Sequence, residues 1–238
     1  MKAIILSLSV LLLAGAAIAQ DKEKDGETIQ GNGTITTREV NVTSFDALKA
    51  TGVYELKLSQ GDKESVKIEA DENLQPLFLV HNEGNQLVVE MKEMEHTNIR
   101  STQKIRVYVT FKKLKSLDLS TVGNVSSDEQ LAFDNLDLRN KSVGNVDLRF
   151  TANTLDLKNH SVGNMKLSGK AGNALVKNNG VGALQAGSFV VQTMDIENTG
   201  VGAAEVNAEK DLKVMDSFLG QVKNKGAAPM RKLKRVRA

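Results

Sequence analysis

Aspartates in the C-terminal half are the residues whose type and spacing could support chemistry. Each follows a leucine or methionine in an alternating segment, and a second polar position follows two residues later on the same face. The aspartates are Asp118, Asp137, Asp156 and Asp195, with Leu175 and Lys213 interrupting the series. The second positions are Ser120, Arg139, Lys158, Lys177 and Glu197. Paired carboxylates on one outer face are what glycoside cleavage requires.

These acids are spread along a series and do not converge, and basic residues accompany them. Stacked like charges repel at the spacing of neighbouring strands, and the basic series offsets that repulsion. The pattern therefore favours a charge-matched wall, or a binding face that includes Asp137, Asp156, Arg139 and Lys158. A polysaccharide lyase or hydrolase is the enzymatic alternative, but we expect no catalytic residues and no enzyme.

Metal-binding and nucleophile motifs are absent from the sequence. The histidines His81, His96 and His160 are scattered, and the chain has no cysteine. Glu93 and Glu95 form the only local cluster with His96, and a solvated loop explains it better than a metal site. There is no G-x-S-x-G elbow and no glycine-rich nonapeptide that binds calcium. We expect no metal and no cofactor.

Internal repetition is the strongest feature of the chain. An apolar residue followed by glycine recurs six times, with successive glycine spacings of 21, 19, 19, 20 and 18 residues. The pairs are Val122-Gly123, Val143-Gly144, Val162-Gly163, Val181-Gly182, Val201-Gly202 and Leu219-Gly220. Alternating segments such as Leu136-Asp137-Leu138-Arg139 flank each pair. A strand of this kind cannot bury its apolar face alone, so the copies must stack.

The repeat length limits the architecture that the stack can adopt. It is too short for the crossover helix of a βαβ unit, and the consensus of leucine-rich repeats does not fit. The remaining solution is an all-β fold, a parallel β-helix (β-solenoid) with one rung of about twenty residues per repeat over residues 115–222. Successive rungs of such a stack rise by ~4.8 Å.

Two columns of turn residues fit this stack. Asparagine stands three residues before the apolar residue at Asn140, Asn159, Asn178 and Asn198, with Asp216 in the last copy. Asparagine tolerates left-handed backbone and can hydrogen-bond along a stacked ladder. The glycine column, including Gly144, Gly163, Gly182 and Gly202, is expected to supply positive φ at a sharp turn. The first copy differs, because its turn is two residues shorter and carries Leu119 at the asparagine position.

The N-terminal half is rich in strand-forming residues but shows no visible repeat. Strands are expected over residues 34–42, 53–58, 65–70, 86–91 and 104–111. No linker rich in proline or serine separates the two halves. We therefore predict a single β-helical domain over residues 29–225, with irregular first coils.

The first residues have the pattern of a signal peptide. Met1-Lys2 is positive, residues 4–13 are apolar, and Ala17-Ile18-Ala19 fits the A-x-A cleavage pattern. The apolar run is too short for a permanent anchor, and no cysteine follows it for lipidation. We expect residues 1–19 to be removed and residues 20–28 to be flexible. The mature chain would have no membrane span and would reach the periplasm, the outer-membrane surface or the medium.

Charge and aromatic content argue against a nucleic-acid partner. Without residues 1–19 the chain has 30 basic and 29 acidic residues, and five of the basic ones lie in a predicted disordered tail over residues 226–238. No tryptophan is present, and the aromatics are not interleaved with basic residues. The partner is predicted to be a protein or an envelope polysaccharide, with the scarcity of aromatics weighing against the latter. An uncapped last rung would also favour homo-oligomers.

The order of several N-terminal segments carries a resemblance to a known family. The segments are Ile29-Gln30-Gly31-Asn32-Gly33, Arg38-Glu39-Val40, Ser44-Phe45-Asp46-Ala47-Leu48, Gly52-Val53-Tyr54, Leu56 to Gly61 and Val66-Lys67-Ile68-Glu69-Ala70. Followed by the Val-Gly-Asn rungs, they resemble the putative auto-transporter adhesin head (GIN domain) family from about residue 29 to about residue 225. The basic tail is not part of that family's pattern.

The resemblance implies an exported, right-handed β-helical domain of cell-envelope proteins, and it carries over no catalytic residues. The adhesin label of the family rests on architecture. Our leading hypothesis is a non-enzymatic envelope or surface protein that presents a rigid β-helical binding face. A periplasmic scaffolding protein is the alternative, and the lyase or hydrolase is the third possibility.

Overall fold

The computed structural model describes residues 27–92, 97–101, 103–217 and 219–233. The predicted signal peptide, most of the predicted flexible N-terminus and the cluster of Glu93, Glu95 and His96 lie outside the described residues. Apart from one 3-10 helix, η1 (Glu72–Leu77), the described secondary structure consists of strands, so the all-β prediction is confirmed. No helix in the described part is long and apolar enough to cross a membrane.

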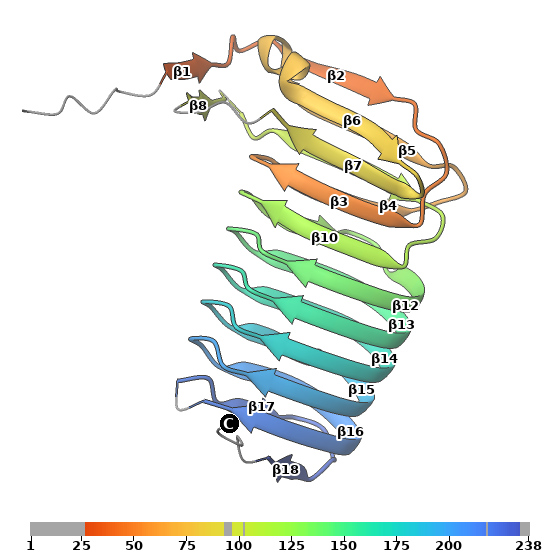
Figure 1. The fold of residues 1–238 in the computed structure, drawn as a ribbon, viewed down its shortest axis with the longest axis vertical. Helices are drawn as coiled ribbons and strands as arrows, with labels where there is room; N and C mark the ends of the chain where they lie inside the picture. The colour runs from red at the N-terminus through yellow and green to blue at the C-terminus, as the bar shows by residue number, and fades with distance from the viewer. Residues whose placement is uncertain (1–26, 93–96, 102, 218, 234–238) are drawn as a thin grey trace, which may run out of the picture.

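The C-terminal half is a stack of parallel strands. They are β10 (Ser116–Thr121), β11 (Val125–Ser127), β12 (Leu131–Asn140), β13 (Val146–Asn159), β14 (Met165–Asn178), β15 (Leu184–Asn198) and β16 (Ala204–Asp216). Each position pairs with the same position of the next repeat, as in Leu138–Leu157 and Leu157–Val176. Figure 1 shows the strands lying one above another along the long axis. The predicted β-solenoid of about six turns with ~20-residue rungs is confirmed.

The core lies inside the stack and is built from one inward-facing side chain per rung at each position. Leu117, Leu138 and Leu157 are buried in one such column. Aromatic rings at neighbouring positions also meet inside the core, and the centroids of Phe133 and Phe150 lie 5.6 Å apart with the rings edge to face. Phe150 and Phe189 approach to 4.7 Å although their strands are two rungs apart, because Gly169 occupies the intervening rung. Each such aromatic pair adds about 0.5–1.5 kcal/mol to the free energy of unfolding, in addition to the effect of burying its apolar surface.

A buried asparagine ladder closes one end of each rung. The Nδ2 atom of Asn140 donates to Oδ1 of Asn159 at 2.9 Å, Asn159 donates to Asn178 at 2.7 Å, and Asn178 donates to Asn198 at 2.6 Å. Asn198 then donates to the carbonyl oxygen of Gly220 at 2.7 Å. All four asparagine side chains are buried. Their amides are thus paired along the stack, as the sequence predicted for this column.

The glycine column follows the asparagine ladder at the same turn. Gly123, Gly144, Gly163, Gly182 and Gly202 have φ values of 145°, 135°, 128°, 126° and 133°. A Cβ atom at Gly163 would collide with the carbonyl oxygen of Gly144. Positive φ and close stacking of the backbones both require glycine here. Gly220 differs, because it is not among the glycines with positive φ and contacts Asn198 and Gly200 instead.

The N-terminal part is a mixed sheet and not merely irregular coils. Its strands are β2 (Ile35–Val40), β3 (Ala47–Gly52), β4 (Glu55–Gln60), β5 (Ser65–Asp71), β6 (Phe78–Glu83), β7 (Gln86–Met91) and β9 (Arg106–Phe111). Strands β1 (Glu27–Gln30) and β8 (Thr97–Arg100) pair in parallel as a separate small sheet. Strands β3 and β4 pair in parallel with β10 and β11 and so form an additional rung. Strands β2, β5 and β9 pair antiparallel, as do β6 and β7. These hairpins cover the N-terminal end of the stack (Figure 1).

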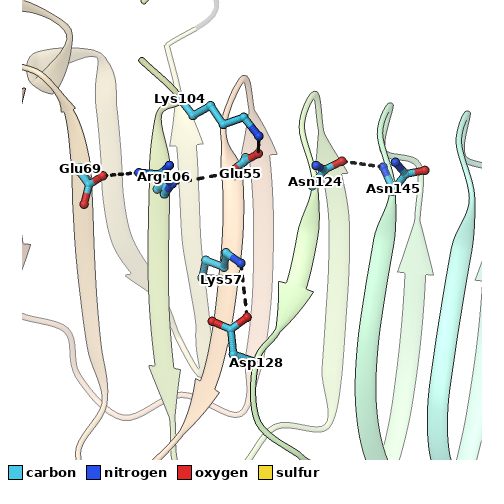
Figure 2. Close-up of polar contacts among 8 residues, drawn as sticks. All are labelled: Glu55, Lys57, Glu69, Lys104, Arg106, Asn124, Asp128 and Asn145. Atoms are coloured by element: carbon cyan, nitrogen blue, oxygen red, sulfur yellow. Dashed lines mark hydrogen bonds and ion pairs between the residues drawn. The ribbon is translucent and has the colours of Figure 1, made fainter.

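Ion pairs and amide contacts fix the register where the mixed sheet joins the solenoid. Figure 2 shows Arg106 on β9 between Glu69 on β5 and Glu55 on β4, with N–O distances of 2.6 and 3.6 Å. The hydrogen bond that Arg106 donates to Glu69 is the main cause that raises the pKa of Arg106 above its ordinary value. On the next turn, the backbone N–H of Asn145 donates to Oδ1 of Asn124 at 3.0 Å. Side chains thus bridge strands that are distant in sequence.

The C-terminal residues correct the prediction of a disordered tail beginning at residue 226. Strand β17 (Val222–Asn224) pairs with the first part of β16, and β18 (Met230–Lys232) pairs with its last part. Arg231 forms an ion pair with Asp211, and Lys232 with Asp216 at 3.0 Å. The basic residues of this segment therefore match acids on the rung beneath. The two short strands cover the last full rung of the solenoid.

Removal of residues 230–238 is expected to lower the free energy of unfolding by about 1–2 kcal/mol, because Leu212 and Val214 would lose one covering strand. Urea titration measures the loss, and a single cooperative transition is expected to remain. Truncation after Leu233, which keeps β18, is the control. Equal stability of both truncated chains would contradict a covering role of β18.

Candidate functional site

A groove of about 1110 Å³ crosses successive rungs at the place where the strands bend. Figure 1 shows the long strands curving around one edge of the stack. The groove begins at residues 112–115, before β10, and continues over β12, β13, β14, β15 and β16. With ~4.8 Å between rungs, these six levels span about 24 Å. The groove is therefore long enough for an extended polymer.

The floor of the groove is apolar and rigid. It is made by Leu136, Leu155, Ala174 and Met194, one residue per rung at paired register positions. Each of these side chains is at most 6% exposed, since each packs into the solenoid core. Residues held by a continuous parallel ladder cannot move independently, so the floor is pre-formed.

The first rim consists of the residue that precedes each floor residue. Its members are Asn135, Thr154, Asn173, Thr193 and Asp211. The hydroxyl of Thr154 donates to Oδ1 of Asn135 at 2.5 Å, and that of Thr193 donates to Oδ1 of Asn173. The amide groups of Asn135 and Asn173 still carry N–H donors, and the threonine oxygens are acceptors. This rim therefore offers hydrogen-bonding groups on every rung.

The second rim consists of the residue after each floor residue, namely Asp137, Asp156, Leu175, Asp195 and Lys213. Asp137 pairs with Arg139 at 3.0 Å, and Asp156 approaches Lys158 at 3.8 Å. Asp195 pairs with Lys213 at 3.1 Å. These ion pairs are partly exposed, and each contributes about 0–1 kcal/mol to the free energy of unfolding. Their main effect is to offset the charge of the rim.

Contacts with the N-terminal part of the chain hold the end of the groove that is formed by residues 112–115. The side chain of Gln60 accepts from the N–H of Ala132 at 2.8 Å and donates to the carbonyl oxygen of Lys112 at 2.9 Å. Lys115 donates to Asp46 at 2.7 Å. This hydrogen bond and the charge of Asp46 raise the pKa of Lys115 above its ordinary value. Lys115 therefore stays cationic at neutral pH.

The structure separates the residues of the predicted binding face. Asp137 and Asp156 line the groove, whereas Arg139 and Lys158 are not among its lining residues and flank it as ion partners. Asp118 was placed in the aspartate series incorrectly. It pairs in register with Arg139, and Ser116 is the residue that pairs with Asp137. The turn itself keeps its length, since Leu119 pairs with Asn140 and Val122 with Val143, but the Leu-Asp-Leu segment of the first copy lies two residues nearer to it.

The rim that precedes the floor was missed from the sequence, although a signal for it is visible. The four segments Asn135-Leu136-Asp137, Thr154-Leu155-Asp156, Asn173-Ala174-Leu175 and Thr193-Met194-Asp195 alternate Asn and Thr at their first position. The sequence did not show that this position lies at a strand bend and faces the same groove as the aspartates.

The turns carry a second exposed column, distinct from the groove residues. Its members are Val53, Val122, Val143, Val162, Val181, Val201 and Leu219, each between 44% and 64% exposed. The valines from Val122 to Val201 are joined by parallel bridges. None of them is among the residues that line the groove, so this column supplies control positions for tests of the groove.

The arrangement of the groove fits binding better than catalysis. Asp137 and Asp156 lie on adjacent rungs, but each is paired with its own cation, whereas a glycosidase needs one carboxyl in a setting that keeps it protonated. Among the described residues, no three His, Cys, Asp or Glu side chains gather as a metal site. His81 contacts Glu83 at 3.0 Å, and neither residue lines the groove.

The fold and the groove define a β-solenoid with a pre-formed surface that runs along its axis. The chain belongs to the family described as "Putative auto-transporter adhesin, head GIN domain", whose model matches residues 44–228. The resemblance inferred from the N-terminal segments and the Val-Gly-Asn rungs is thereby confirmed. No curated protein matches the chain.

Solved structures share this fold over nearly the whole chain. A putative adhesin from Bacteroides fragilis is 26% identical with a TM-score of 0.74, and the match covers 86% of this chain and 100% of the other. A putative lipid binding protein from Parabacteroides distasonis is 17% identical, with a TM-score of 0.62 and coverage of 87% and 100%. A putative adhesin from Parabacteroides merdae is 21% identical, with a TM-score of 0.56 and coverage of 88% and 100%. The last two comparisons show the fold alone.

Proposed function

We propose that the protein is a non-enzymatic, exported component of the bacterial cell surface that binds its partner in the groove, in the manner of an adhesin. The groove across six levels of the solenoid is the observation that carries this proposal. Membership of the adhesin-head family supports it. A rigid floor with a polar group on each rung suits binding, because little conformational entropy is lost when the partner docks.

Protease shaving of intact cells tests the location. A surface protein is expected to disappear from unbroken cells, whereas a periplasmic scaffold would be cleaved only after the outer membrane is opened. Full protection in intact cells, with cleavage after permeabilisation, would overturn the surface assignment.

Replacement of Leu175 by arginine tests the groove. Leu175 is 43% exposed on the second rim, so arginine can replace it with a change of at most about 0.5 kcal/mol in the free energy of unfolding. The long charged side chain would occupy the middle of the groove. We expect binding to isolated bacterial envelopes that retain their surface polysaccharide to fall about tenfold or more, which corresponds to about 1.4 kcal/mol.

Val162→Arg is the matched control for this variant. It converts another exposed apolar residue, 52% exposed, to arginine on a neighbouring turn outside the groove. Pull-down of the two purified variants with the same envelopes measures the difference. Equal binding of Leu175→Arg and wild type, or equal loss in both variants, would contradict the groove as the binding surface.

A further inference from the structure

The geometry points to a linear, uncharged polysaccharide as the occupant of the groove, with its chain parallel to the solenoid axis. This assignment rests on the proposed binding function and adds the chemical class of the partner. Three properties of the groove carry it: the balance of charge, the repetition of polar groups and the pairing of the backbone.

The charge of the lining does not suit a polyion. Five aspartates and four lysines line the groove, and the aspartates of the second rim are paired with Arg139, Lys158 and Lys213. Asp211 on the first rim is paired with Arg231. A polyanion would meet aspartates on most rungs, and a polycation would have to displace the existing cations. A neutral chain is not repelled by the aspartates and does not have to displace the cations that pair with them.

Polar groups repeat on every rung of the first rim, and on every rung of the second rim except that of Leu175. Asn135, Thr154, Asn173 and Thr193 offer amide and hydroxyl groups on one side, and Asp137 and Asp156 offer carboxylates on the other. A glycan presents hydroxyl groups along its edges and C–H groups on its ring faces, and it repeats them with every sugar. Its hydroxyls can pair with both rims, while the ring faces rest on Leu155, Ala174 and Met194.

The carboxylates of Asp137 and Asp156 have spare hydrogen-bonding capacity. In each, Oδ2 contacts the cation, whereas Oδ1 is buried and has no hydrogen-bond partner among the described residues. Such an unpaired buried oxygen is costly. The two side chains are 35% and 41% exposed, and Oδ2 has a second lone pair, so a hydroxyl in the groove can donate to Oδ2 while the cation stays in place. Asp137 and Asp156 are paired positions of adjacent rungs, so two carboxylates in a row can accept hydroxyl groups of the ligand.

A peptide fits the groove less well than a glycan. Extended peptides are usually bound by addition to a free strand edge, which offers unpaired N–H and C=O groups. The groove crosses β12, β13, β14, β15 and β16 perpendicular to their direction, and these strands are paired with one another on both sides. The groove therefore presents side chains and few free backbone groups.

Calorimetry with neutral linear glucans, mannans, xylans and galactans tests the assignment, each offered as a ladder from dimer to octamer. We expect at least one neutral series to bind with an affinity that rises about tenfold or more from dimer to hexamer. We also expect the affinity to change less than twofold between low and moderate salt, since charge contributes little. Leu175→Arg should abolish this binding and Val162→Arg should retain it. Binding of polygalacturonate alone, or of no neutral series, would overturn the assignment.

Chemical treatment of the envelopes separates failure of the glycan assignment from failure of the proposed function. Periodate, which cleaves vicinal diols, is expected to abolish binding of the wild-type protein, whereas protease treatment should leave it unchanged. Groove-dependent binding that survives periodate and is lost on protease treatment would reject the glycan and keep the groove as a protein-binding surface. Binding that is unaffected by Leu175→Arg would reject the proposed function itself.

Discussion

Replacement of Asn159 by alanine is expected to lower the free energy of unfolding by about 3–5 kcal/mol, because it interrupts a buried ladder in the middle of the stack. Oδ1 of Asn159 accepts from Asn140 and from the hydroxyl of Ser161, at 2.9 and 2.8 Å, and its Nδ2 donates to Asn178 at 2.7 Å. Alanine would leave these three partners buried without their hydrogen bonds, at about 1–3 kcal/mol for each unsatisfied group. Urea denaturation measures the loss.

Asn179→Ala is the matched control for the ladder. Asn179 lies next to the ladder residue Asn178, but its side chain is exposed and contacts the hydroxyl of Thr199 on the surface. Its replacement is expected to change stability by at most about 0.5 kcal/mol. Similar losses in the two variants would show that burial of the ladder does not determine the stability of the turns.

Replacement of Gly163 by valine is expected to lower the free energy of unfolding by more than about 3 kcal/mol. The residue has φ = 128°, and a side chain in this region of backbone space is strained by about 1–3 kcal/mol. The new Cβ atom would also collide with the carbonyl oxygen of Gly144 on the preceding rung. Since Gly182 stacks on the other side, relief of the collision would separate adjacent rungs. Thermal and urea denaturation measure the effect.

Gly84→Val separates backbone strain from the collision. Gly84 also has positive φ, at 58°, but a Cβ atom there meets no heavy atom within 4 Å. Its replacement is expected to lower the free energy of unfolding by about 1–2 kcal/mol, through backbone strain alone. Equal losses for Gly84→Val and Gly163→Val would contradict the role of the glycine column in the close stacking of the turns.

The solenoid was predictable because its determinants lie in one-dimensional patterns. Alternation of apolar residues, a period of about twenty residues and fixed turn residues at Asn159 and Gly163 require stacked parallel rungs. The structure accordingly stacks these residues at the paired positions of successive rungs. The repeat length alone excluded a crossover helix between neighbouring strands.

The first rung, formed by β3 and β4, was not predictable from the repeat. Its backbone pairs with the next rung, but its sequence does not carry the repeated residues. Strands β3 and β4 flank a turn in which Tyr54 stacks against Gly123, where later copies carry glycine. The phenol of Tyr54 donates to the carbonyl oxygen of Val89 at 2.9 Å inside the mixed sheet. Strands β3 and β4 pair in parallel with β7 and β9, which in turn pair antiparallel with β6 and β5, and such contacts leave no period in the sequence.

The groove was partly predictable. The aspartates at Asp137 and Asp156 were recognised as outward-facing, but the alternation of apolar and polar residues does not show where each long strand bends. That bend brings Asn135 and Thr154 to the opposite rim. The error at Asp118 has a different origin. The Leu-Asp-Leu segment of the first copy lies two residues nearer its turn, which changes the register without changing the alternation of apolar and polar residues.

Photo-crosslinking on living cells tests most directly the claim that the protein binds its partner through the groove. A photoreactive amino acid would be placed at Leu175 in one variant and at Val162 in another, since both sites are exposed and only Leu175 lines the groove. The account predicts a high-mass adduct on illumination from position 175 and none from position 162. An adduct from position 162 alone, or from neither position, would contradict it.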